Sequence, residues 1–196
     1  MALNLIKRIS GKELIKKARE VSLLNLREVK PYSNARISFK EFNPESEEAK
    51  PPTLYLLKPQ IEWAKKLRNI FLKEHEIDVL KLKEALVYEI NEQKFTLLPV
   101  IVEFSEADNQ AVIADGAHRA FLARTLNKSF SALYVENADK EYPYYALPNE
   151  WSEVSLHEDL STVSRKKNYR HENKEELYKL YRDYNILGEG LISAPR

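Results

Sequence analysis

The residues from Leu98 to Val135 constrain the fold of this chain more than any other stretch. A β-rich apolar run at Leu98–Phe104 is followed by a polar turn and by a second short apolar run at 110–114. Two such runs joined by a short turn predict an antiparallel hairpin. Residues 117–126 hold good helix formers without a breaker, and residues 130–135 are almost continuously apolar, as in a buried strand. This order predicts an α/β (α+β) fold with a small mixed β-sheet and flanking helices.

The turn before this helix reads Asp115-Gly116-Ala117-His118-Arg119 and carries the candidate chemistry. Gly116 has no Cβ, so the backbone can turn sharply and a ligand can approach closely. The first N–H groups of a helix have no intrahelical partner and together present roughly half a positive charge, which favours an anion. Arg119 offers a planar fork for phosphate oxygens, and His118 can donate a hydrogen bond or carry a proton. We therefore expect a phosphate site at Gly116, Ala117, His118 and Arg119.

The sequence predicts three segments, of which the middle one contains this region. Residues 1–25 predict an N-terminal helical extension, because apolar residues recur at helical spacing after Gly11. Residues 26–136 are expected to form the core, with an insertion at about 43–60 that starts in a polar, proline-rich stretch. Residues 137–196 are expected to form a C-terminal extension packed on the core, with a final helix at 174–183.

Three segments of the core have patterns of their own. Leu26–Val29 is typical of a short strand that ends at the turn after Lys30. The residues from Gln60 to Ala85 follow a helical period, with a break near Glu76–Asp78 that would divide them into two helices. Residues 88–97 are ambiguous and fit a helix end followed by a hairpin strand, with Asn91-Glu92-Gln93 as the turn.

Composition excludes several classes of protein. The chain has 196 residues, enough for one domain with additions, and it has no cysteine, which excludes disulfides, thiolate metal sites and a cysteine nucleophile. We expect no metal site on the protein itself. No apolar run approaches the roughly 20 residues of a membrane span, and the N-terminus lacks the features of a signal peptide. We therefore expect a cytoplasmic protein that makes no contact with membranes.

A net charge of +1 gives no overall field toward nucleic acid, but two basic clusters stand out. The first lies within residues 7–30, and the second comprises Arg165, Lys166, Lys167 and Arg170. Clusters of this size are most often solvated faces. The alternative is that they contact DNA or a partner protein.

Two separate sequence motifs of this chain, called boxes below, resemble those of a known family. LLPVIVEF at 97–104, followed by AVIADGAHRAFLARTLNKSFSALYV at 111–135, resembles the core of the ParB/sulfiredoxin-like fold, in which a PVxV strand precedes an xxDGxHR turn. Leu26–Arg36, with its Pro-Tyr and its arginine, looks like the first box of that family. The resemblance covers about half of the chain and does not reach residues 137–196. It implies a small α/β domain with a nucleotide phosphate site in the second box.

The members of this fold differ in the turn itself. Sulfiredoxins carry a cysteine there, and Ala117 takes its place, which excludes their activity. ParB partition proteins bind CTP through a GERRxRA turn, from which His118 and Arg119 depart. The DGAHR turn is most similar to the DGHHR-type turn of the free-serine kinases, and this likeness implies phosphate-site and catalytic roles for Asp115, His118 and Arg119. Those kinases place a catalytic glutamate just after the Lys-Pro of the first box, where this chain has Ser33.

These observations lead to one functional expectation and two alternatives. The first is a nucleotide-binding protein that transfers a phosphoryl group to a small hydroxyl compound, with ATP, ADP or CTP as the nucleotide and Mg²⁺ as a companion ion. Glu28 and Glu41 are the nearest acids for a general base, and Arg36 could reach a phosphate from the first box. One alternative is a non-enzymatic ParB-like module in which nucleotide binding switches contact with DNA or a partner protein. The other is a ParB-like nuclease. For the nuclease, the sequence shows no cluster of carboxylates of the kind that a two-metal site needs.

Overall fold

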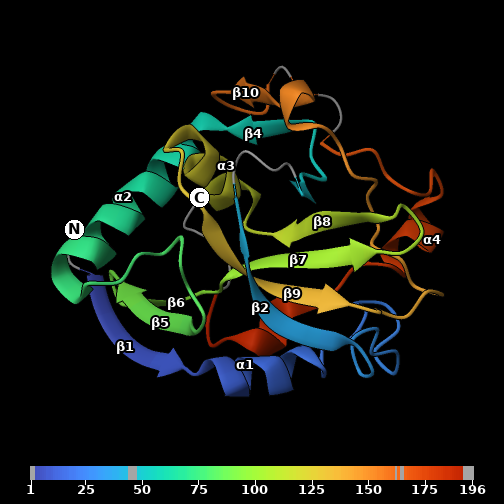
Figure 1. Ribbon diagram of the computed structural model, residues 1–196, viewed down its shortest axis with the longest axis horizontal. Coiled ribbons are helices and arrows are strands. Elements are labelled where there is room, and N and C mark those ends of the chain that lie inside the picture. The colour runs from blue at the N-terminus through green and yellow to red at the C-terminus, as the bar shows by residue number, and fades with distance from the viewer. Residues whose placement is uncertain (1–2, 44–47, 162, 164–165, 192–196) are drawn as a thin grey trace.

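The computed structural model describes residues 3–43, 48–161, 163 and 166–191, so Arg165 of the second basic cluster lies outside the described residues. At its centre is a five-stranded mixed sheet with the order β2-β9-β7-β8-β3 (Figure 1). The strands are β2 (Arg36–Phe42), β3 (Ala49–Lys50), β7 (Val100–Ser105), β8 (Gln110–Asp115) and β9 (Phe130–Glu136). The β7–β8 pair is the predicted antiparallel hairpin, and β9 runs parallel to β7. The expected α+β fold is confirmed.

Alternate residues of the central strands enter two different cores. Val100 and Val102 of β7 lie in one core with buried residues of α2 (Lys58–His75) and α3 (Ala117–Thr125). Ile101, between them, lies in a second core with buried residues of α1 (Gly11–Ala18). Successive side chains of a strand point to opposite faces. The sheet is therefore covered by α2 and α3 on one face and by α1 on the other.

A second, three-stranded sheet lies beside the first and has the order β1-β5-β6. Its strands are β1 (Leu3–Ile9), β5 (Ala85–Ile90) and β6 (Gln93–Leu97), all antiparallel to their neighbours. Between β5 and β6, Asn91 and Glu92 have φ values of 50° and 63°, as a tight hairpin turn requires. The hairpin turn and the strand after it form as expected, but the residues before the turn belong to strand β5 and not to the end of a helix.

Some predicted elements differ from the observed ones. Leu26–Val29 forms a turn in which the Val29 N–H binds the Leu26 carbonyl at 3.0 Å, so the predicted strand there is wrong. The N-terminal extension contains α1 but also the strand β1, whose backbone groups find partners on β5. The helix from residue 60 ends at His75, because Glu76 is left-handed with φ 58°, and no second helix follows before β5. The final helix is short, α4 (Lys174–Tyr178), and the 3₁₀ turn η2 (Tyr184–Leu187) follows it.

The C-terminal segment is packed on the core by several contacts. The turn η1 (Trp151–Glu153) places Trp151 in the core beneath α2 and α3, and η2 places Leu187 in the core beneath α1. The strand β10 (Ser155–His157) pairs in parallel with β4 (Tyr55–Leu57), just before α2. β4 lies within the predicted insertion, so the C-terminal segment pairs with part of that insertion.

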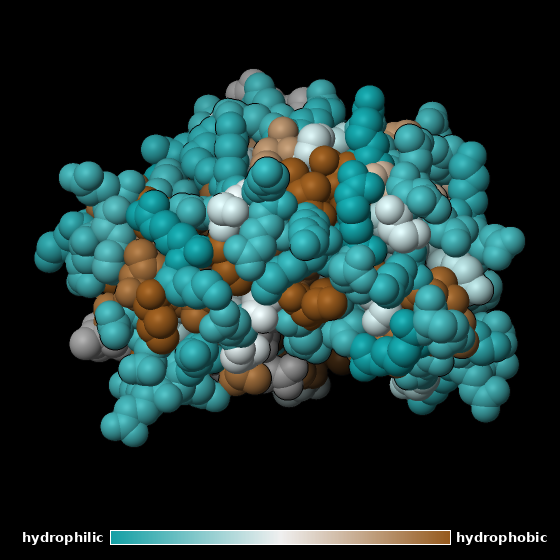
Figure 2. Space-filling view, turned by 90° about the horizontal axis from the view of Figure 1, so that it is seen from below, coloured by the Kyte–Doolittle hydropathy of each residue, from teal (hydrophilic) through white to brown (hydrophobic). Residues whose placement is uncertain are grey.

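The face seen from below, where α1 lies, is mainly hydrophilic with separate hydrophobic spots (Figure 2). Among the described residues, no helix combines the length and the apolar character that a membrane crossing needs.

Candidate functional site

The turn predicted as the phosphate site joins β8 to α3 without a loop between them. β8 ends at Asp115, Gly116 is left-handed with φ 86° and ψ 23°, and α3 starts at Ala117. A Cβ at Gly116 would lie 2.9 Å from Nη2 of Arg119 and 3.2 Å from Cγ2 of Val100. Both the backbone conformation and the lack of space therefore require glycine here. No side chain caps the start of α3 among the residues that the structure describes.

Arg119 lies inside the protein rather than at the mouth of the turn. It is only 7% exposed, and its guanidinium donates to the carbonyl oxygen of Leu98 and, at 3.5 Å, to that of Pro99. Its Nη2 also lies 3.7 Å from the Asp115 carboxylate. Arg119 thus connects the turn to the start of β7. Its proposed contact with phosphate stays a prediction.

His118 is partly buried beside the start of α2. Its Nε2 accepts a hydrogen bond from the Leu57 N–H at 3.4 Å, so the neutral ring carries its proton on Nδ1. Burial, with the positive charges of Lys166 and Arg119 nearby, lowers the pKa of His118 to about 4. The ring is therefore neutral at physiological pH and has one N–H to offer a ligand.

Two cavities open on either side of the turn. Four residues line both of them: Gln60, Asp115, Gly116 and His118. The first cavity, of about 170 Å³, is largely apolar and is lined further by Trp63, Ala64, Leu67, Tyr88, Thr96, Leu97, Leu98 and Arg119. The second, of about 260 Å³, is more polar and is lined further by Pro52, Thr53, Leu56, Ile113, Ala114, Ala117, Lys166 and Lys167. The turn thus lies between a cavity with a more apolar lining and a more polar cavity that is lined by two lysines.

Lys166 and Lys167 belong to this site, although the sequence indicated them only as part of a basic cluster. They come from the C-terminal segment and line the second cavity opposite Ala117 and His118. Burial and the charge of Lys166 lower the pKa of Lys167 to about 7, while Asp115 acts in the opposite direction. No motif in the sequence marks these two lysines, because the backbone that places them is folded back from a distant part of the chain.

Asp115 is the acid nearest to the turn. Burial raises the pKa of its carboxyl group, while the charge of Arg119 and a hydrogen bond from the Gly116 N–H oppose that rise. The side chain is 39% exposed and lines both cavities. Asp115 is thus within reach of a ligand in either compartment.

The structure does not bring the other predicted site residues to the turn. Glu41 on β2 binds Lys81 at 2.6 Å and also accepts from the Ser129 hydroxyl, away from both cavities. Arg36 is paired with Glu136 at 2.6 Å on the exposed edge strand. Glu28 is an exposed residue of the turn before β2. None of the three lines either of the two cavities.

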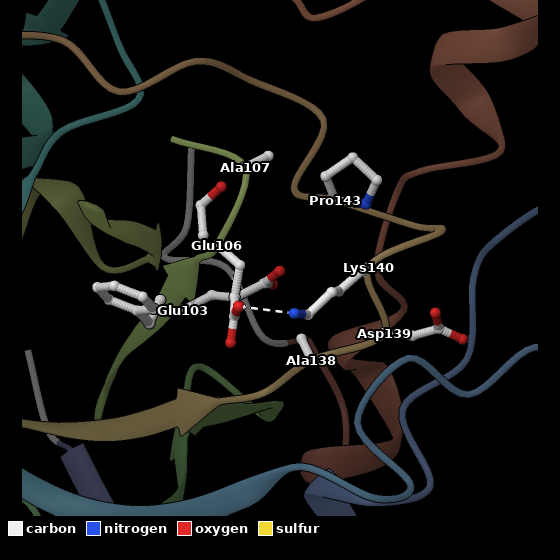
Figure 3. A pocket seen from close by; sticks show the side chains of 9 residues that line it. Glu103, Glu106, Ala107, Ala138, Asp139, Lys140 and Pro143 are labelled. Atoms are coloured by element: carbon white, nitrogen blue, oxygen red, sulfur yellow. Dashed lines mark ion pairs between the residues drawn. The ribbon is translucent and has the colours of Figure 1, made fainter. Parts of the chain in front are cut away.

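A third cavity, of about 220 Å³, lies at the far end of β7, away from the turn (Figure 3). Lys140 reaches across it to Glu106 at 2.9 Å, and the Asp139 carboxylate points away from this pair. Glu103, at its base, is bound to Arg182. Two carboxylates of this cavity, Glu103 and Glu106, thus have cationic partners from the same chain. In the described part of the chain, no three metal-binding side chains come together.

The basic residues near the N-terminus are largely paired with acids of the same chain. Lys7 binds Glu189 at 2.8 Å, Arg8 lies 3.3 Å from Glu84, and Lys30 binds Glu20 at 2.5 Å. Arg27 is paired with Asp183 as well. These contacts reduce the free positive charge that a surface for DNA would need.

Of the comparisons with known proteins, one gives a match, and that match covers the core of the chain. No curated protein and no solved structure matches the chain significantly. A family model described as the ParB CE domain matches residues 13–155, from α1 to the start of β10. This range includes the central sheet, both of its helical covers and the Asp115–Arg119 turn. Because the match spans well over half of the sequence, the chain belongs to the ParB CE domain family.

Proposed function

We propose that the Asp115–Arg119 turn binds the phosphate groups of a nucleotide, with ATP, ADP and CTP as candidates. The observation that carries this proposal is the meeting of three positive features at one cavity: the uncapped start of α3, Lys166 and Lys167. An anion there would be held by backbone N–H groups and by two ammonium groups.

The energies of such contacts fit a nucleotide better than free phosphate. Two or three charge-assisted hydrogen bonds supply roughly 3–9 kcal/mol before the cost of ordering the ligand. Micromolar affinity requires about 8 kcal/mol. The neighbouring apolar cavity, with Trp63, Tyr88 and Leu98 in its lining, is a place where a flat ring could add the remainder. We propose that it takes the base or the sugar.

We further propose that the bound nucleotide donates a phosphoryl group to a small hydroxyl compound. Glu28 and Glu41 lie elsewhere, so Asp115 is the acid that this chain offers as general base or as a ligand for Mg²⁺.

Binding is tested by thermal unfolding with ATP, ADP, CTP, GTP and inorganic phosphate in turn. The decisive variant is Ala117→Asp, which places a carboxylate at the start of α3, where it suits the helix but repels an anion. Ala107→Asp makes the same change on an exposed loop at the third cavity. We expect at least one nucleotide to raise the melting temperature of the natural protein and of Ala107→Asp, but not of Ala117→Asp. No stabilisation of the natural protein by any ligand would refute the proposal.

Phosphoryl transfer has a separate test. With Mg²⁺ and a set of small hydroxyl compounds, the natural protein should release nucleoside diphosphate from ATP or CTP, or nucleoside monophosphate from ADP, only when the acceptor is present. Asp115→Asn should keep nucleotide binding and lose this release. If the natural protein binds nucleotide and releases none with any acceptor, the binding proposal stands and the transfer proposal falls.

A further inference from the structure

The C-terminal segment from Lys166 to Arg170 is fixed firmly against the phosphate site. The carbonyl oxygen of Lys166 accepts hydrogen bonds from the Leu54 N–H at 2.8 Å and from the Thr53 hydroxyl at 3.1 Å. The Arg170 N–H donates to the Tyr145 carbonyl at 3.0 Å. This segment lies beyond residues 13–155, which the family model matches, so it is an addition to the family core.

The side chain of Lys167 is held by a group of tyrosines. Its ammonium lies 4.3 Å from the centre of the Tyr145 ring, donates to the Tyr145 hydroxyl, and donates to the Tyr144 hydroxyl at 3.3 Å. The Tyr145 ring is stacked on Tyr181 at 4.1 Å. Tyr144 in turn donates to the Ala114 carbonyl, just before the turn, at 3.1 Å. The amine is therefore positioned in the wall of the cavity by aromatic contacts that limit its movement.

Charged groups of both signs lie around this amine. Lys166 is its neighbour in the cavity wall, Asp115 is the only carboxylate among the described residues that line the cavity, and Arg119 lies 3.7 Å from Asp115. Burial raises the pKa values of both Tyr144 and Tyr145, so their hydroxyls stay neutral. An anion in the cavity would lie beside both Lys166 and Lys167, which line it.

We propose that Lys166 and Lys167 form the second wall of the phosphate site, that they select phosphates with two negative charges, and that Lys167 takes up a proton as the ligand binds. This inference rests on the proposed function. A phosphate monoester or the terminal phosphate of a nucleotide carries two charges above pH 7, whereas a phosphodiester carries one. Two ammonium groups and a helix start match the former. Because burial lowers the pKa of Lys167 to about 7, much of the amine is neutral at pH 8 until a bound anion raises that pKa.

Calorimetric titration of the full chain tests this inference with 5′-AMP and 3′,5′-cyclic AMP, which share a base and differ in phosphate charge. Inorganic phosphate serves as a ligand without a base. Each titration is run at pH 8 in two buffers of different ionisation enthalpy, so that proton uptake is measured directly. We expect 5′-AMP to bind about tenfold or more tightly than cyclic AMP, with net proton uptake only for 5′-AMP and inorganic phosphate.

Three variants assign the effect to Lys167. Lys167→Met should weaken 5′-AMP about tenfold or more and abolish proton uptake, with little effect on cyclic AMP. Lys167→Arg keeps a permanent charge, so it should retain binding between pH 7 and 9 but show no uptake. Lys128→Met removes an exposed lysine near the other end of α3 and should behave as the natural protein. Circular dichroism and the melting temperature of each variant check that it is folded.

The possible failures differ in what they overturn. If no nucleotide and no phosphate binds the natural protein, the proposed function falls together with this inference. If 5′-AMP and cyclic AMP bind equally without proton uptake, and Lys167→Met binds as the natural protein does, the role of the lysines falls and the phosphate-binding turn stands.

Discussion

Arg182 and Glu103 form a bidentate ion pair inside the protein, with side chains only 1% and 2% exposed. Nη2 of Arg182 lies 2.7 Å from Oε1 of Glu103, and its Nε lies 3.2 Å from Oε2. The Tyr32 hydroxyl donates to the same Oε2 at 2.5 Å. Glu103 is in β7 of the central sheet, and Arg182 is in the C-terminal segment. The pair thus anchors to the core the same segment that carries Lys166 and Lys167.

Breaking this ion pair should destabilise the whole protein. Glu103→Gln or Arg182→Met leaves one charge buried without its partner, and we expect a loss of about 3–5 kcal/mol in the free energy of unfolding. Urea unfolding measures it. The double variant should lose clearly less than the sum of the two single ones, since neither charge is then stranded. A loss under about 1 kcal/mol in both single variants would contradict a structural role for the pair.

Gly116→Ala should strain the turn. A side chain in the left-handed region costs about 1–2 kcal/mol, and the added Cβ would meet Arg119 and Val100 as well. We expect a lower melting temperature and weaker nucleotide binding. Asn127, also left-handed with φ 49° after α3, provides the control: Asn127→Gly should lose no stability. Equal stability of Gly116→Ala and the natural protein would show that the turn has another conformation.

Arg119→Met tests whether this arginine is needed without any ligand. The substitution leaves the carbonyl oxygens of Leu98 and Pro99 without their buried donor, which costs about 1–3 kcal/mol. We therefore expect reduced stability in ligand-free buffer, measured by thermal unfolding. If Arg119 acted only on phosphate, the ligand-free variant would instead be as stable as the natural protein.

His118 should titrate well below its ordinary range. Its pKa is lowered from 6.5 to about 4, and NMR of the ring protons at increasing pH would show the midpoint. Between these values the unfolded state binds more protons than the folded state, so stability should fall as the pH drops from 6.5 toward 4. His118→Gln removes this contribution and should make stability less dependent on pH in that range. A midpoint near 6.5 in the natural protein would contradict the burial of the ring.

The local elements of the core could be predicted because their signals are local. The apolar runs of β7, β8 and β9, the glycine between β8 and α3, and the hairpin turn at Asn91 all depend on neighbouring residues. The strand predicted at Leu26–Val29 is wrong because strand formation also depends on residues that are distant in the sequence. A strand needs a partner strand, and this backbone instead closes a turn through the bond from the Val29 N–H to the Leu26 carbonyl, with both side chains only partly buried.

The sequence by itself determined the β8–α3 turn and its resemblance to a phosphate-binding box, since a glycine with positive φ at a helix start is specified within a few residues. Only the tertiary structure decided which side chains surround that turn. It directed Arg119 inward to the Leu98 and Pro99 carbonyls, and left Glu28 and Glu41 elsewhere. It also brought Lys166 and Lys167 to the cavity, because a buried ion pair and aromatic stacking fold the C-terminal segment back over the core. Contacts between residues so far apart in the chain leave no periodic or spaced signal in the sequence.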